Sequence, residues 1–133
     1  MKIETIEKYL DKIGISPGPW LKGIAMQYGK RHYGVVNKDY DIALCGDMDD
    51  PWEKESGEAN MNVLVASRDM LVMLFDCAFT FEFYAKEHRK KHGVGNEKYQ
   101  RNRLMFEATI ENLEQALSRP WEEIRKELEE MEE

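Results

Sequence analysis

The sequence predicts an α+β fold in which a small antiparallel sheet of about three strands packs on a long antiparallel helical hairpin, with a short helix at each end of the chain. Three observations predict this class. Residues 58–91 hold the densest run of large apolar side chains, residues 20–45 are rich in β-branched and aromatic residues, and both chain ends repeat apolar residues every three or four positions. We expect a single domain over residues 1–133, because a chain of this length buries enough surface to fold without metals or disulfides.

The charge of the chain is acidic overall but unevenly distributed. The 133 residues include 19 Lys and Arg against 26 Asp and Glu, which gives a net charge of −7. Residues 86–103 carry +5, so the remainder carries −12. The acidic remainder disfavours nonspecific nucleic-acid binding by the whole surface. Cys45 and Cys77 lie in apolar surroundings and no signal-peptide pattern follows Met1, so we expect a reduced, cytoplasmic protein.

The N-terminal segment predicts a short amphipathic helix. Its apolar residues are Ile3, Ile6, Leu10 and Ile13, at spacings of three and four. Gly14 ends the pattern, and two prolines in residues 16–19 prevent its continuation.

Residues 20–45 predict a three-stranded antiparallel meander with turns near Gly29 and over residues 37–39. Residues 20–28 also suit a helix, so the first strand is the open alternative. The apolar residues expected to share one face are Trp20, Ile24, Met26 and Tyr28, then Tyr33 and Val35, then Tyr40, Ile42 and Leu44. We expect the central helix to cover that face.

An acidic stretch, residues 46–57, is expected to be an exposed loop before the central helix. Asp47, Asp49 and Asp50 offer carboxylates to a hard cation. The spacing and closing Glu of an EF-hand are absent, so a solvated linker is the favoured interpretation.

The central helix is expected to begin near Glu58 and either to continue or to break at Ser67, whose hydroxyl would cap a new start. It is apolar on two sides. Because Met70–Phe81 is a run of 12 residues that contains Asp76, a membrane span is disfavoured. The second apolar side predicts a homodimer or a higher symmetric assembly, unless the N-terminal helix covers it. The candidate interface residues are Val72, Phe75, Phe79 and Phe83.

The same region carries a family resemblance. Glu58-Ala59-Asn60, followed by Leu64, Ala66, Asp69, Leu71 and Leu74, resembles a segment of small prophage-encoded proteins of unknown function. Trp20 ahead of a hairpin is similar to their layout, whereas Arg68 stands where those proteins usually have proline. The resemblance implies a mobile-element origin and no catalytic residues.

The C-terminal half predicts the second arm of a helical hairpin and a final helix. Gly93 is expected to stop the first arm and Asn96 to cap the second. Pro120 is expected to start a new helix, since proline suits a first turn. The apolar stripe is Phe106, Ile110, Leu113 and Leu117, then Trp121, Ile124, Leu128 and Met131.

Candidate chemistry is sparse. His88 and His92 stand one helical turn apart, but Arg89, Lys90 and Lys91 lie between them and oppose a cation. Ser67 and the two cysteines have no histidine nearby in sequence, and the Gly93-x-Gly95 pair lies between helices rather than after a strand. We therefore expect no catalytic residues, no metal, no cofactor and no enzymatic activity.

The function that the sequence favours is binding to another macromolecule, more readily a protein than a nucleic acid. The alternative is nucleic-acid binding by the basic tip of the helical hairpin, since clustered cations grip phosphates. The candidate residues for that alternative are Lys86, Arg89, Lys90, Lys91, Arg101 and Arg103.

Overall fold

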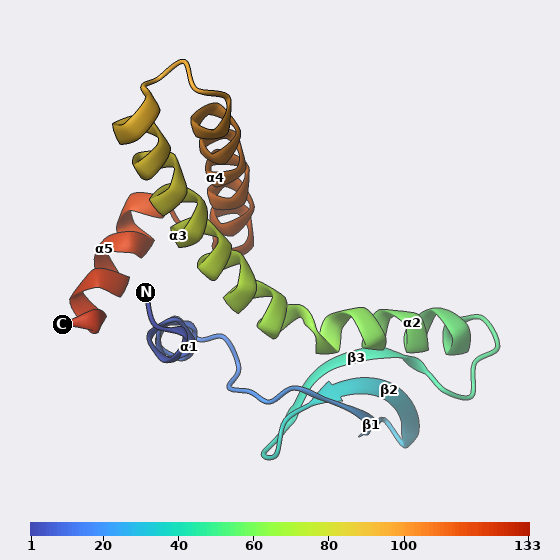
Figure 1. Ribbon diagram of the computed structural model, residues 1–133. Coiled ribbons are helices and arrows are strands. Elements are labelled where there is room, and N and C mark those ends of the chain that lie inside the picture. The colour runs from blue at the N-terminus through green and yellow to red at the C-terminus, as the bar shows by residue number, and fades with distance from the viewer. The chain divides into compact units, whose positions relative to one another are not determined.

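The computed structural model describes all residues 1–133 and has the predicted α+β class (Figure 1). No helix in it is long and apolar enough to span a bilayer. The elements in chain order are α1 (Ile3–Lys12), β1 (Leu21–Gln27), β2 (Lys30–Val36), β3 (Asp41–Asp47), α2 (Glu53–Val65), α3 (Ser67–His92), α4 (Glu97–Leu117) and α5 (Trp121–Glu132).

The chain packs into two compact units. The sheet unit is Ile13–Met70, and the helical unit combines Met1–Lys12 with Leu71–Glu133. The first turn of α3 therefore belongs to the sheet unit and its remainder to the helical unit. The single domain over residues 1–133 stays a prediction.

The sheet is an antiparallel meander in the order β1-β2-β3. A two-residue turn joins β1 to β2, and its residues Tyr28 and Gly29 both have positive φ, 52° and 72°, as a type I′ turn requires. The β1–β2 register runs without a shift from Leu21 opposite Val36 to Gln27 opposite Lys30. Residues 20–28 thus contain a strand, and the helical alternative is wrong.

Helix α2 packs on β3 and β2 through a backbone contact. A Cβ added to Gly57 would lie 2.9 Å from the carbonyl oxygen of Cys45 and 3.0 Å from Cα of Gly46. Only glycine allows this approach. The sheet is covered by α2, which begins at Glu53 rather than near Glu58, so the predicted exposed loop is shorter than expected. Its start is fixed by Asp50, whose carboxylate accepts the backbone N–H groups of Trp52 and Glu53 at 2.8 and 3.3 Å.

The helical run breaks at Ala66, between α2 and α3. The predicted capping role of Ser67 is wrong, because its hydroxyl donates to the carbonyl of Leu64 at 2.7 Å and so closes the preceding turn. Arg68 is buried, and its Nε–H donates to the carbonyl of Ser16 at 3.1 Å. This contact anchors the segment that leads into β1.

The helical unit has an aromatic core. Phe75 of α3 lies 6.1 Å from the ring of Tyr9 in α1 and 6.2 Å from that of Trp121 in α5. Helices α3 and α4 run antiparallel (Figure 1). The predicted turn is confirmed: α3 stops before Gly93, whose φ is 81°, and Asn96 accepts the backbone N–H of Tyr99 at 3.0 Å.

The start of α5 is also confirmed at Pro120, which is its N-cap residue. Arg119, just before it, donates from Nη1 to the hydroxyl of Tyr9 at 2.8 Å and from Nη2 to Glu127 at 2.9 Å. Burial raises the pKa of Tyr9 above its usual value, while the nearby Arg119 acts in the opposite direction. The guanidinium thus links α1 to α5.

Candidate interaction surfaces

The outer edge of β1 is open and apolar. Ile24 is 57% exposed and Met26 is 60% exposed, whereas Ala25 between them is buried. The expectation that Ile24 and Met26 face the interior is therefore wrong. The physical reason is size: the side chain of Val36 lies 3.0 Å from where a Cβ on Gly23 would be, and Cβ of Ala25 lies 3.2 Å from where a Cβ on Gly34 would be. Small residues pack closely here, and the large ones face solvent.

The backbone of β1 also has free hydrogen-bonding groups. The pair that closes a two-residue turn, here Gln27 and Lys30, is a hydrogen-bonded pair, and such pairs alternate along an antiparallel ladder with pairs that are not hydrogen-bonded. By this alternation Lys22, Ile24 and Met26 direct their N–H and C=O groups away from β2. No element of the sheet lies on that side.

The other edge strand, β3, carries two features that oppose strand addition. Its pairing with β2 contains two register shifts, and Asp41 and Asp47 stand at its ends. Bulges and charges are the features by which natural sheets protect their edges. In contrast, β1 has no bulge, no proline and one charge, Lys22. Of the two edges, β1 therefore has the fewer protective features.

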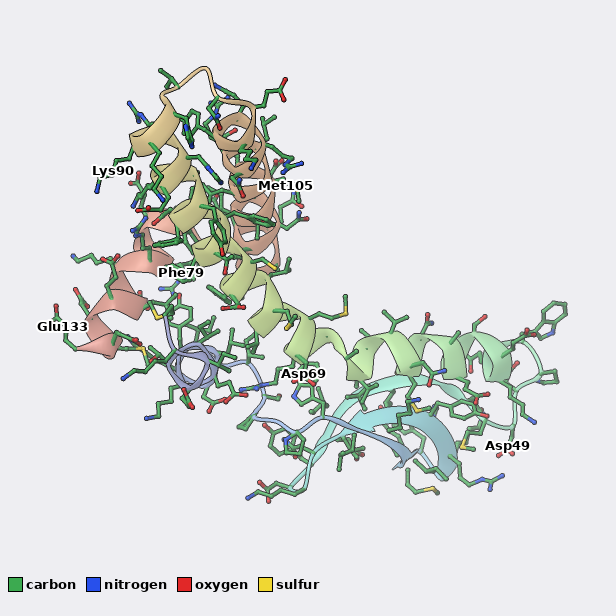
Figure 2. All side chains as sticks on the ribbon, in the orientation of Figure 1. Asp49, Asp69, Phe79, Lys90, Met105 and Glu133 are labelled. Carbon is green, nitrogen blue, oxygen red and sulfur yellow. The ribbon has the colours of Figure 1, made fainter.

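The predicted interface on α3 lies mostly inside the helical unit. Val72 and Phe75 are buried, and the ring of Phe79 lies 5.5 Å from that of Trp121 (Figure 2). Phe83 alone is largely exposed, at 59%. The expectation of an exposed face is corrected for Val72 and Phe75, because α1 and α5 supply the cover. Oligomeric state itself stays a prediction.

The basic tip of the α3–α4 hairpin divides into paired and unpaired cations. Lys86 pairs with Glu82 at 3.1 Å, Lys91 with Glu87 at 3.6 Å, and Arg103 with Glu107 at 3.4 Å, each on its own helix. The remaining four cations of the tip form no ion pair. They are Arg89, Lys90, Lys98 and Arg101, and Lys90 extends away from the hairpin in Figure 2.

A row of rings runs along the same part of α3. The ring of Tyr84 lies 6.4 Å from that of His88, which in turn lies 6.3 Å from that of His92, and both pairs are stacked. The two histidines are the half metal site considered from sequence. No third histidine, cysteine or carboxylate joins them in a cluster.

The acidic stretch uses its carboxylates within the protein. Asp47 accepts the backbone N–H of Asp49 at 2.9 Å, and Asp49 pairs with Arg31 at 3.0 Å. The bond from the Asp49 amide, with help from Lys30, holds the pKa of Asp47 below its usual range. Asp50 accepts the N–H groups of Trp52 and Glu53, so each aspartate of this stretch has a partner from the chain.

The candidate nucleophiles are poorly placed for reaction. Burial raises the pKa of the Cys45 thiol, which keeps it protonated and less nucleophilic at neutral pH. The hydroxyl of Ser67 already donates to Leu64. Cys45 and Cys77 are both free thiols and half-buried.

A cleft of about 450 Å³ opens in the helical unit between α4 and α5. Phe106 and Trp121 form part of its wall, and the ion pair of Arg125 with Glu82, at 2.5 Å, lies at its rim. The buried Nε1–H of Trp121 has no hydrogen-bond partner. The lining contains no serine, cysteine or histidine.

Comparison of the chain with protein family models, with curated proteins and with solved structures found no match. Sequence reasoning had located the basic tip but had missed the β1 edge. The signal that was available is the alternation along the chain of the small residues Gly23, Ala25 and Gly34 with large apolar or aromatic residues.

Proposed function

We propose that this chain is a non-enzymatic accessory protein of prophage type that binds another protein chain by strand addition at the edge of β1. One observation carries the proposal: β1 is an unprotected edge strand whose largest apolar side chains, Ile24 and Met26, are more than half exposed. Strand addition gains affinity from main-chain hydrogen bonds and specificity from alternate side chains. The free thiols Cys45 and Cys77 support a reducing, cytoplasmic location.

A site-specific photocrosslink tests this proposal. We would replace Met26 with p-benzoylphenylalanine and irradiate the protein in host cells, with the same replacement at Val63 as the matched control. Val63 is comparably exposed but lies on α2. We expect a discrete adduct, to a second copy or to another protein, from position 26 and none from position 63. Equal adducts from both positions, or none from position 26, would contradict the proposal.

Nucleic-acid binding by the basic tip is the second candidate, because Arg89, Lys90, Lys98 and Arg101 form no ion pairs there. When a Lys or Arg side chain binds a phosphate, it releases the counterions condensed on the nucleic acid. A cation that has no ion pair within the protein can do so without first breaking one. The stacked ring of Tyr84 beside His88 adds a surface of the kind on which unpaired bases stack.

Salt titration separates the two candidates. Duplex and single-stranded probes would be titrated at low and moderate salt against wild type and an R89A/K90A/R101A variant. The matched control is K86A/K91A/R103A, which also removes three cations, each already paired with a glutamate of its own helix. Tight, salt-sensitive binding that is lost in the first variant and kept in the control would favour nucleic acid. No binding at low salt would remove this candidate.

A further inference from the structure

The free edge of β1 fits a particular partner. We infer that the added strand is β1 of a second copy of this chain, paired antiparallel about a two-fold axis at Ile24. The inference rests on the proposed function, because it names the partner of the same edge. The three-stranded sheets of the two copies then form one continuous sheet of six strands, in which the two β1 strands are neighbours.

The register follows from the geometry of the strand. With the axis at Ile24, this residue lies opposite its own copy, Lys22 lies opposite Met26, Gly23 lies opposite Ala25, and Leu21 lies opposite Gln27. All seven residues of β1 are then paired. Lys22, Ile24 and Met26 are also the residues whose backbone groups point outward, so each meets an outward-pointing partner and exchanges two hydrogen bonds with it.

Other registers lose contacts or create repulsion. Sliding one strand by two residues reduces the hydrogen-bonded pairs to two. Sliding it by four in one direction places Lys22 opposite its own copy, and like charges directly opposite each other destabilise a sheet. In the centred register the only charge of the strand instead lies opposite Met26, whose exposed side chain the aliphatic stem of Lys22 covers.

The centred register also removes the exposed apolar surface from water. Ile24 meets Ile24 at the axis, and paired β-branched residues are favourable across a sheet. By symmetry, each of the two Met26 side chains lies beside the Lys22 side chain of the other copy. The strand is therefore complementary to itself in hydrogen bonding, charge and side-chain type.

Sedimentation velocity over a concentration series tests the inference. Wild type is expected to shift from 15.7 kDa to twice that mass as concentration rises. Ile24→Lys and Ile24→Glu each place like charges together at the axis and are expected to raise the dimer dissociation constant at least about tenfold. An equimolar mixture of the two variants is expected to restore the dimer, because Lys then lies opposite Glu. Val63→Lys, on α2, is the control that leaves the dimer unchanged.

The outcomes separate this inference from the proposal on which it rests. Circular dichroism first checks that each variant keeps the wild-type spectrum. Ile24→Pro then provides a second test, because Ile24 directs its N–H outward and proline removes that group without breaking the β1–β2 ladder. A dimer unaffected by these variants, or a wild type that stays monomeric throughout, overturns the inference. If a different protein is crosslinked at position 26, strand addition stands and self-pairing falls.

Discussion

The two units of this chain manage apolar surface in opposite ways. In the helical unit Phe75 is fully buried, Tyr9 and Trp121 cover it, and α1 and α5 close the face that α3 alone would expose. In the sheet unit the least exposed positions of β1 are the small residues Gly23 and Ala25, and Ile24 and Met26 face solvent. The face of α3 that carries Phe75 is therefore covered within its own unit, whereas β1 keeps an open edge.

This difference shows that apolar density predicts a core rather than an interface. Burying one large apolar side chain contributes roughly 1.5–3 kcal/mol. In a helical unit, short amphipathic helices such as α1 and α5 can cover a longer helix, so the free energy of burial is gained within the unit. An edge strand has no such cover within its own sheet, so its exposed side chains and backbone groups remain free for another chain.

The largest expected effect is on the covered aromatic core of the helical unit. Phe75→Ala removes a fully buried ring that contacts Tyr9 and Trp121. We expect a loss of about 3–5 kcal/mol in the free energy of unfolding, because the cavity adds to the lost transfer energy. The matched control is Phe83→Ala on the same helix, where the ring is 59% exposed. Urea unfolding followed by far-UV circular dichroism measures both, and similar losses for the two variants would contradict the described core.

A smaller effect tests the backbone packing of the sheet unit. Gly57→Ala places a Cβ within 2.9 Å of the Cys45 carbonyl oxygen. Alanine normally favours a helix interior by about 0.5–1 kcal/mol over glycine. Here we expect the opposite sign, a loss of about 1–3 kcal/mol from overpacking.

The control for this substitution is Gly95→Ala, where no atom lies within 4 Å of the added Cβ. That variant is expected to change the free energy of unfolding by no more than about 0.5 kcal/mol. Thermal unfolding of both variants shows whether each substitution stabilises or destabilises the fold. Stabilisation by Gly57→Ala would mean that α2 does not approach β3 at this point.

The N-cap of α4 at the hairpin turn tests the contribution of a single hydrogen bond in the helical unit. Asn96→Ala removes the acceptor of the Tyr99 N–H and is expected to cost about 1 kcal/mol. Asn102→Ala is the control, because that side chain donates to the Lys98 carbonyl within α4 and caps nothing. Equal losses measured by urea unfolding would remove the capping role from Asn96.

The helices were more predictable from sequence than the sheet, for physical reasons. The ends at Gly93, Asn96 and Pro120 rest on local chemistry, namely a positive φ, a side-chain cap and a missing N–H, so the sequence pattern suffices. The start of α2 was misplaced because Asp50, which accepts the N–H groups of Trp52 and Glu53, lies within an acidic stretch that resembles a solvated loop.

The surfaces were harder to predict because they depend on contacts far apart in sequence. Val72 and Phe75 gave the expected apolar pattern, but which element covers them depends on Tyr9 and Trp121, more than 40 residues away. The β1 edge depends on the close approach of Ala25 to Gly34, which alternation of apolar residues alone does not reveal. The paired and unpaired cations of the basic tip were likewise indistinguishable until their partners were known.

The smallest effect is the pH dependence of the sheet unit. The pKa of Asp47 is lowered by its bond from the Asp49 amide. A lowered pKa in the folded state gives a stabilising contribution that is fully present above the unfolded value, about 3.9, and is lost as pH falls through the folded value. We expect Asp47→Asn to lose less unfolding free energy than wild type as the pH falls below about 4. Asp39→Asn, at an exposed turn, is the control, and an equally reduced loss there would contradict this assignment.

The most direct test of the open edge is amide hydrogen exchange of β1, resolved by residue with NMR. At low protein concentration the amides of Lys22, Ile24 and Met26 are expected to exchange rapidly, while those of Gly23 and Ala25 are protected by β2. At high concentration, or with a bound partner strand, the first three are expected to become protected and the other two to change little. Protection of Lys22, Ile24 and Met26 that is already complete at low concentration, or absent under every condition, would contradict the account of β1 as the strand that receives another chain.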